Sequence, residues 1–146
     1  MSGQTVEILL VEDNEDDILL EQEAIVEAKL VNLMYVVRDG EEAMAYLRRE
    51  GKYQNAQLPG LILLDINMPK KNGFEVLNEI KADPAIMHIP IVMLTTSDSE
   101  SDIVKSYAKG ACSFITKPMD FYKFSEVIRQ FALYWALVAR VPAASR

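Results

Sequence analysis

The chain is poor in several kinds of residue, and each shortage excludes a class of protein. Its single cysteine, Cys112, cannot form an internal disulfide bond, so we expect a reducing compartment. Its only histidine is His88, and no glycine-rich phosphate cradle accompanies it, which excludes a histidine kinase. No apolar run approaches the ~20 residues that a membrane-spanning helix needs, so a membrane protein is excluded as well.

Basic residues are also in short supply. Lysine and arginine number 15 against 22 acidic residues, and the net charge is -7. This balance gives no electrostatic footprint for nucleic acid or for an anionic membrane surface. The adjacent lysines Lys70 and Lys71 are interpreted as a solvated turn. We therefore predict a cytoplasmic protein whose partners are other proteins or small ions.

What the chain does contain is a regular alternation of short apolar runs and helical patterns. With 146 residues, 50% of them hydrophobic, it is long enough for one well-packed domain and short for two. Strands are predicted near residues 6–11, 33–37, 60–64, 89–94 and 112–116. Helical patterns fill the gaps, so we predict an α/β fold of the (βα)5 type, a doubly wound five-stranded parallel sheet with right-handed crossovers.

The helices are predicted from their start signals and their faces. Capping side chains stand three residues ahead of an acid in the pairs Asp39 and Glu42, Asn72 and Glu75, and Ser99 and Asp102. The first helix is predicted to turn four apolar residues toward the sheet, namely Ile18, Leu19, Ile25 and Val26. Its acidic residues are predicted mostly to face outward, namely Glu15, Asp16, Glu21 and Glu23.

Polar side chains follow four of the predicted strands at the point where each strand ends. Glu12 and Asp13 follow the first strand, and Asp65 follows the third. Thr95 and Lys117 follow the fourth and the fifth strands. The carboxyl ends of parallel strands meet at one edge of the sheet, which is where open α/β sheets carry their sites. Three acids, a hydroxyl and a lysine would then converge, a set that suits a divalent cation and a phosphoryl group.

Most of these residues also have a purely structural interpretation. Glu12 and Asp13 would favour the dipole at the start of the first helix, with Asn14 as its cap. Asp65 could be a solvated residue at the head of the turn that follows it. The placement of the acids opposite each other favours a site, and Lys117 strengthens that interpretation. Its positive charge is what a carboxylate nucleophile and an incoming phosphoryl group both need.

At these positions the chain resembles the receiver domain of bacterial two-component response regulators over residues 6–131. The motifs that carry the resemblance are Val-Glu-Asp-Asn (11–14), Leu-Leu-Asp-Ile-Asn-Met-Pro (63–69), Asn-Gly (72–73), Leu-Thr-Thr-Ser (94–97) and Phe-Ile-Thr-Lys-Pro (114–118). Within that family it is most similar to the stand-alone regulators paired with phytochrome-type sensor kinases. The resemblance implies a flavodoxin-like strand order, 2-1-3-4-5.

The resemblance implies the roles of the acidic residues. Asp65 would be the phosphoacceptor. Mg2+ (or Mn2+) would be held by the carboxylates of Glu12, Asp13 and Asp65 and by the backbone carbonyl of Asn67. Glu12 stands where many members of the family have aspartate, and the family tolerates either acid.

The resemblance also implies which residues respond to the phosphoryl group. Thr95 would be the switch hydroxyl, with Thr96 beside it, and Lys117 would pair with the phosphate. Phe114 would be the aromatic residue whose packing changes on activation. Many receivers have tyrosine there, and phenylalanine cannot donate the hydroxyl hydrogen bond that tyrosine offers. The alternative for Phe114 is an ordinary core aromatic residue.

The implied function is that of a single-domain response regulator. A sensor histidine kinase, of the phytochrome type, would phosphorylate Asp65, and the signal would pass to an unidentified downstream protein. The chain would be a signalling protein and not an enzyme, since it would catalyse only its own phosphorylation and dephosphorylation. We expect one receiver domain, residues 1–146, with its core at 6–131 and a helical extension at 132–146. Only residues 141–146 follow the last helix, so no output domain is expected.

Several alternatives stay open. The chain could instead be an intermediate in a phosphorelay or a phosphate sink for another sensor kinase. A flavin-binding electron carrier shares the architecture, but Glu12 and Asp13 would repel the cofactor's phosphate. A phosphatase with an aspartyl nucleophile would need a second acid two residues after that nucleophile. This chain has Asn67 there, so such an enzyme would lack a general acid.

The last helix, which begins at Asp120, predicts self-association. Its apolar sector is broader than one stripe facing the sheet requires, and the surplus would be an exposed patch on a monomer. We predict a two-fold homodimer through the fourth helix, the fifth strand and the fifth helix. Its face would include Ile103, Tyr107, Phe124, Phe131 and Trp135. The alternative is that the extension folds back over its own domain.

Overall fold

Five short apolar segments form one parallel sheet in the computed structural model of the chain. The structure describes residues 6–28, 31–95, 100–111, 113–116 and 122–130. The strands are β1 (Val6–Val11), β2 (Val31–Val37), β3 (Leu61–Asp65), β4 (Ile91–Thr95) and β5 (Ser113–Thr116). The helices are α1 (Glu15–Ala28), α2 (Gly40–Leu47), α3 (Gly73–Lys81), α4 (Glu100–Ala108), the short 3-10 turn η1 (Gly51–Tyr53) and a helix over residues 122–130. Among the described helices, none has both the length and the apolar character to cross a lipid bilayer.

The strand order is β2-β1-β3-β4-β5, and every pairing is parallel, which confirms the predicted fold. Strand β1 lies second from one edge of the sheet, and it pairs with β2 on one side and with β3 on the other. Its residues 8–11 are buried on both faces of the sheet, so this part of the strand is a continuous apolar run in the sequence. The observed limits of β1 coincide with the predicted ones, and those of the other strands differ by at most two residues.

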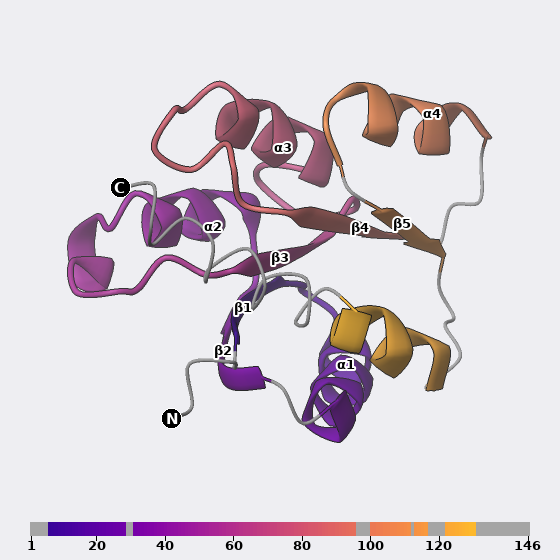
Figure 1. Cartoon of the computed structure of the whole chain (residues 1–146). Helices are drawn as coiled ribbons and strands as arrows, with labels where there is room; N and C mark the ends of the chain where they lie inside the picture. Colours follow the sequence, from indigo (N-terminus) through magenta and orange to yellow (C-terminus); the bar gives the residue numbers. More distant parts are fainter. Residues whose placement is uncertain (1–5, 29–30, 96–99, 112, 117–121, 131–146) are drawn as a thin grey trace, which may run out of the picture.

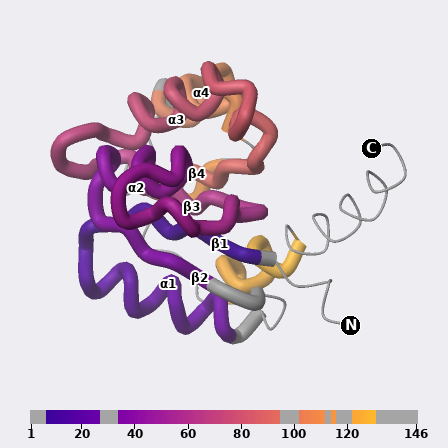
Figure 2. The backbone as a smooth tube through the Cα atoms, turned by 90° about the vertical axis from the view of Figure 1, so that its left-hand side faces the viewer, coloured from indigo at the N-terminus to yellow at the C-terminus, as the bar shows by residue number. Residues whose placement is uncertain are grey.

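Helices cover both faces of the sheet. Helices α2, α3 and α4 lie on one face, and α1 and the helix of residues 122–130 lie on the other (Figures 1 and 2). Each layer has its own core cluster. Leu9 and Val11 of β1 point into the first cluster, whereas Ile8 and Leu10 point into the second. This alternation is what a strand buried on both faces requires.

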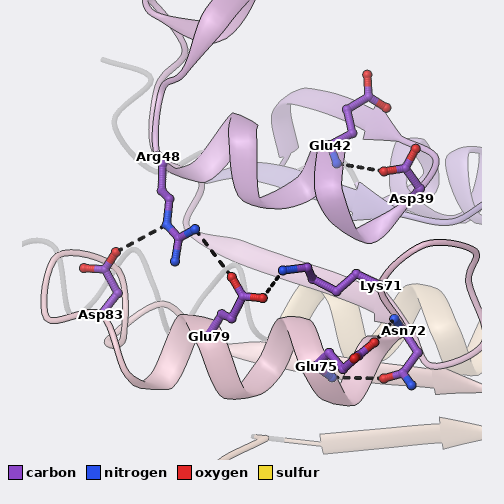
Figure 3. A network of polar contacts seen from close by, with 8 residues as sticks. All are labelled: Asp39, Glu42, Arg48, Lys71, Asn72, Glu75, Glu79 and Asp83. Carbon is purple, nitrogen blue, oxygen red and sulfur yellow. Dashed lines mark hydrogen bonds and ion pairs between the residues drawn. The ribbon is translucent and has the colours of Figure 1, made fainter.

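The predicted capping residues begin two helices as expected. Asp39 accepts a hydrogen bond from the backbone N–H of Glu42 at the start of α2. Asn72 and Glu75 form a reciprocal capping box at the start of α3, which Figure 3 shows at close range. These two predictions are confirmed, whereas Ser99 lies outside the described residues. Asn14 accepts from the N–H of Asp17, so α1 is capped as well.

The prediction for the faces of α1 was only partly right. Ile18 and Ile25 are buried, as expected, but Leu19 and Val26 are 59% and 73% exposed. Glu21, expected to face outward, is instead 0% exposed. The buried stripe advances by three and then four residues, from 18 to 21 to 25, which is the spacing of one helix face. Position 21 therefore lies on the stripe that faces the sheet, and the charge of its side chain does not move it off that stripe.

An aromatic cluster closes the edge of the sheet beside β2. Tyr35 stacks on Tyr46 with 4.9 Å between ring centroids, and Tyr53 meets Tyr46 edge-on at 5.2 Å. The buried Tyr53 hydroxyl donates a hydrogen bond to the Glu42 carboxylate at 2.5 Å. That hydrogen bond, assisted by the charge of Lys52, lowers the pKa of Glu42 below its ordinary value.

Replacing Tyr53 by phenylalanine is expected to lower the free energy of unfolding by about 1 kcal/mol at neutral pH. The depressed pKa of Glu42 gives stability that is present above the pKa of the unfolded chain and is lost as the pH falls through the folded value. The difference between wild type and Tyr53→Phe should therefore shrink below about pH 4. Urea unfolding at neutral and acid pH measures it. A difference that grows in acid would contradict this account.

Candidate functional site

Three acidic side chains meet at the carboxyl edge of the sheet. Val11 of β1 is paired with Leu64 of β3, so Glu12 and Asp65 follow on neighbouring strands at the same level. The carboxylates of Glu12, Asp13 and Asp65 offer oxygen atoms that all lie within 4.8 Å of one another. Glu12 and Asp65 are buried, whereas Asp13 is exposed. The group is thus enclosed by protein on one side and open to water on the other.

Backbone groups hold the two buried acids in place. The N–H of Glu12 donates to the carbonyl of Val37 at 3.0 Å, which extends the pairing of β1 and β2 by one residue. The Glu12 carboxylate accepts from the N–H of Asn14 at 3.2 Å. The Asp65 carboxylate accepts from the N–H of Asn67 at the same distance. Such hydrogen bonds fix the direction of each carboxylate.

The loop after β3 returns closely on the end of the strand. The N–H of Gly73 donates to the carbonyl of Ile66 at 2.8 Å, which closes the loop. A Cβ added to Gly73 would lie 2.5 Å from the carbonyl oxygen of Asp65, a distance that no side chain tolerates. Only glycine therefore lets α3 begin directly against the acidic group. The sequence Asn-Gly at 72–73 combines this close approach with the helix cap.

The acidic group fits a divalent cation. Carboxylate oxygens are the hard ligands that Mg2+ and Mn2+ prefer, and Mg2+ commonly takes one or two carboxylates and keeps several waters. The exposed side of Asp13 leaves room for such waters, and three neighbouring negative charges favour a cation between them. Glu12, Asp13 and Asp65 would be its side-chain ligands.

Sequence reasoning missed two acids near this group, Asp17 and Glu21. Glu21 reaches from α1 so that its carboxylate, with those of Glu12 and Asp17, forms a second group within 4.8 Å. The two groups share Glu12. The signal that could have found Glu21 is its position on the stripe between Ile18 and Ile25, because a helix places residues at that spacing on one face.

The switch residues predicted from the sequence are described only in part. Asp65 is paired with Leu94, so β4 brings the backbone of Thr95 to the edge of the sheet one residue beyond. Phe114 of β5 is partly buried and packs against the first core cluster. The side chain of Thr95 lies outside the described part of the structure. The other predicted residues outside it are Thr96, Cys112, Lys117, Phe131 and Trp135.

One residue of the predicted dimer face needs correction. Phe124 is 1% exposed and packs in the second core cluster, because the helix of residues 122–130 turns it toward the sheet. It therefore cannot lie on a free surface. Tyr107 and Val104 of α4 are exposed, and Ile103 is partly so.

Comparisons with known proteins extend these observations. The family described as "Response regulator receiver domain" matches residues 8–129, which include the acidic group and Phe114. The response regulator Rcp1 of Synechocystis sp. is 40% identical over 137 residues, which cover 94% of this chain and 93% of the relative.

Two solved structures are similar over nearly the whole fold. The phosphorylated cyanobacterial phytochrome response regulator RcpA is 47% identical and has a TM-score of 0.79, with 90% of this chain and 94% of that chain covered. The Mn(2+)-bound form of Rcp1 is 39% identical and has a TM-score of 0.77, with the same coverage. The acidic edge therefore lies in a fold for which a phosphorylated form and a metal-bound form have both been solved.

Proposed function

Because the chain belongs to the response regulator receiver domain family, we propose that it accepts a phosphoryl group on Asp65 from a sensor histidine kinase of the phytochrome type. Phosphorylation then changes its conformation and so carries the signal. The observation that carries the proposal is the group of Glu12, Asp13 and Asp65, whose carboxylates lie within 4.8 Å at the sheet edge.

The chemical step belongs to Asp65. One carboxylate oxygen attacks the phosphorus of a phosphohistidine on the kinase, and an oxygen–phosphorus bond forms while the phosphorus–nitrogen bond breaks. The electron pair of the broken bond leaves with the imidazole, which takes up a proton. Mg2+ held by Glu12, Asp13 and Asp65, with the Asn67 carbonyl, would supply positive charge against the phosphoryl oxygens. Hydrolysis of the acyl phosphate later restores Asp65.

The proposed switch uses residues of β4 and β5. The phosphoryl oxygens offer acceptors to the Thr95 hydroxyl and a charge partner to Lys117. The Thr95 hydroxyl would draw the following loop inward, and Phe114 would then repack behind it. The pairing of Thr95 with Thr116 and of Met93 with Phe114 supports this coupling, because β4 and β5 are neighbours in the sheet. The result is a population shift biased by a local change of charge.

The direct test is phosphorylation without any kinase. Incubated with a small-molecule phosphodonor and Mg2+, the protein should gain one phosphoryl group that is stable in acid and labile in base. Removal of Mg2+ by a chelator should prevent labelling, because the phosphoryl charge would then meet three carboxylates. Intact mass spectrometry detects the product. Labelling that is unaffected by the chelator would contradict the proposed metal site.

The kinase is proposed from the similarity to named relatives. RcpA is a cyanobacterial phytochrome response regulator by name, and this chain is 47% identical to it. Phosphotransfer profiling against the histidine kinases of the source organism tests the proposal, and the fastest transfer should come from a phytochrome-type kinase. Fastest transfer from a kinase of another class, or onward transfer to a histidine of another protein, would favour a relay or a phosphate sink instead.

We also propose a homodimer through α4, β5 and the last helix. Val104 and Tyr107 are large apolar side chains that α4 exposes at 61% and 49%. The segment after residue 130, which includes Trp135, adds further apolar residues to the same end of the chain. Large apolar side chains exposed on one helix, as Val104 and Tyr107 are, are typical of an interface.

Sedimentation at high micromolar concentration tests the dimer. Wild type should sediment as a dimer, and Trp135→Glu and Tyr107→Glu should sediment as folded monomers, because a buried unpaired carboxylate is costly at an interface. Val26→Glu is the matched control, since Val26 is an exposed apolar residue of α1 and should leave the dimer intact. A wild-type monomer, with and without phosphorylation, would show that the proposed interface is wrong.

A further inference from the structure

Helix α2 begins in direct contact with the loop that follows β3. A Cβ added to Gly40, the first residue of α2, would lie 2.1 Å from the carbonyl oxygen of Lys71 and 2.6 Å from its Cβ. The closest atom belongs to the backbone, so no change of side-chain rotamer could relieve the overlap. The absence of a side chain at Gly40 therefore lets α2 and the loop touch through their backbones.

Charged side chains fasten the same two segments together. Lys70 lies 3.6 Å from the carboxylate of Asp39, the residue that caps α2. Lys71 pairs with Glu79 of α3, and Glu79 also lies 3.4 Å from Arg48 at the end of α2 (Figure 3). The interpretation of the two lysines as a solvated turn was therefore incomplete. Lys71 in particular is partly buried between α2 and α3.

The loop itself has little freedom between these supports. The N–H of Lys71 donates to the carbonyl of Pro69 at 2.7 Å, and Lys70 adopts a positive φ of 68°. The hydrogen bond from Gly73 to Ile66 closes the loop at its base. A side chain rarely adopts a positive φ unless its surroundings hold it there. We call the closed loop of residues 66–73 the ring. Its outer corner is formed by Lys70 and Lys71, which contact the start of α2.

The ring carries Asn67, which contacts Asp65 directly. The N–H of Asn67 donates to the Asp65 carboxylate, and its carbonyl is the proposed backbone ligand of the divalent cation. A methyl group at Gly40 would displace the outer corner, and because the ring is closed, the Asn67 carbonyl would be displaced with it. Groups that orient the ligands of a metal typically change its affinity by about 10- to 100-fold when they are altered.

We propose that Gly40 is a positioning residue of the divalent cation site. Gly40 contacts the backbone of Lys71 and in this way holds the Asn67 carbonyl in place. The inference rests on the proposed function, because it takes the acidic group as the cation site. It assigns to the start of α2 a part in cation binding, although no atom of Gly40 belongs to the group of carboxylates.

Titration calorimetry of the full chain with magnesium chloride tests this directly. Gly40→Ala is expected to raise the dissociation constant for Mg2+ about tenfold. Phosphorylation at saturating Mg2+ should remain within about twofold of wild type, because Asp65 itself is unchanged. Gly51→Ala is the matched control, since Gly51 has a positive φ of 59° but its added Cβ would meet nothing within 4 Å. This control should lose stability without losing affinity for Mg2+.

A second variant decides the matter if Gly40→Ala does not fold. Lys71→Met removes the pair with Glu79 and also removes a positive charge from the loop that carries Asn67. Simple electrostatics predicts tighter Mg2+ binding after that change, whereas loosening of the ring predicts binding weaker by about twofold or more.

The outcomes separate the inference from the function on which it rests. A wild type that takes up no Mg2+ would remove the proposed cation site itself. A wild type that binds Mg2+ while folded Gly40→Ala binds it equally well would overturn the inference alone. Weaker binding by both Gly40→Ala and Lys71→Met, with Gly51→Ala unchanged, would establish it. If only Lys71→Met folds, binding as tight as or tighter than wild type would overturn it.

Discussion

Asp65→Asn is expected to abolish phosphorylation while the protein remains folded. Asparagine has the same shape as aspartate, and its amide oxygen can still accept the hydrogen bond that Asn67 donates. The substitution removes the oxygen that we propose as the nucleophile, so no acyl phosphate should form. It also removes one of three crowded negative charges, and we therefore expect the variant to unfold no more easily than wild type in the absence of a divalent cation.

Intact mass spectrometry after treatment with a small phosphodonor and Mg2+ measures the effect. Wild type should gain one phosphoryl group, and Asp65→Asn should gain none. Asp16→Asn is the matched control, because Asp16 is an exposed acid of α1 outside both acidic groups, and it should be labelled like wild type. Labelling of Asp65→Asn at the wild-type rate would assign the acceptor to another residue.

Mg2+ is expected to stabilise the fold strongly. A ligand that binds only the folded chain adds about 2.7 kcal/mol at a hundredfold excess over its dissociation constant. For a chain of this size that corresponds to a rise of roughly 5–10 °C in melting temperature. The physical source is the relief of repulsion among Glu12, Asp13 and Asp65, which the fold brings within 4.8 Å of one another.

Thermal unfolding with and without Mg2+ measures this effect in three proteins. Wild type should show the full rise, and Asp13→Ala a much smaller one, because one ligand is missing. Without Mg2+, Asp13→Ala should melt at or above the wild-type temperature, because it lacks one of the repelling charges. Lys117→Ala should keep the rise, since a lysine repels the cation and is not a ligand. Equal rises in wild type and Asp13→Ala would rule out the proposed ligand set.

The sheet could be predicted because its signals are local. Strands β1, β3 and β4 are short, mostly apolar runs buried on both faces, and the polar residue at or after the end of each run marks the edge of the sheet. This reasoning placed Glu12 and Asp65 at one edge before any pairing was known. The register of Val11 with Leu64 bears that placement out. The helix caps could be predicted for the same reason, because Asp39 and Asn72 each accept a hydrogen bond from a residue only three positions later.

The failures involve contacts between segments that are distant in sequence. Glu21 is the exception, because its spacing from Ile18 and Ile25 is a local signal, but its charge alone predicted the wrong side of the helix. The hydrogen bond between Tyr53 and Glu42 joins η1 to α2 across a turn, and no spacing rule predicts it. The contact between Gly40 and Lys71 joins the start of one helix to the loop before another, and it is visible only in three dimensions.

The strand order also has a consequence for the way the chain is made. The first strand synthesised, β1, becomes the second strand of the sheet, and β2 pairs with its outer side. Every later strand then adds to the other side in the order of synthesis, β3 to β1, β4 to β3 and β5 to β4. No strand has to be inserted between two that are already paired. A chain emerging from the ribosome can therefore build its sheet from one edge to the other. At each stage only the newest strand has an unpaired edge on the growing side.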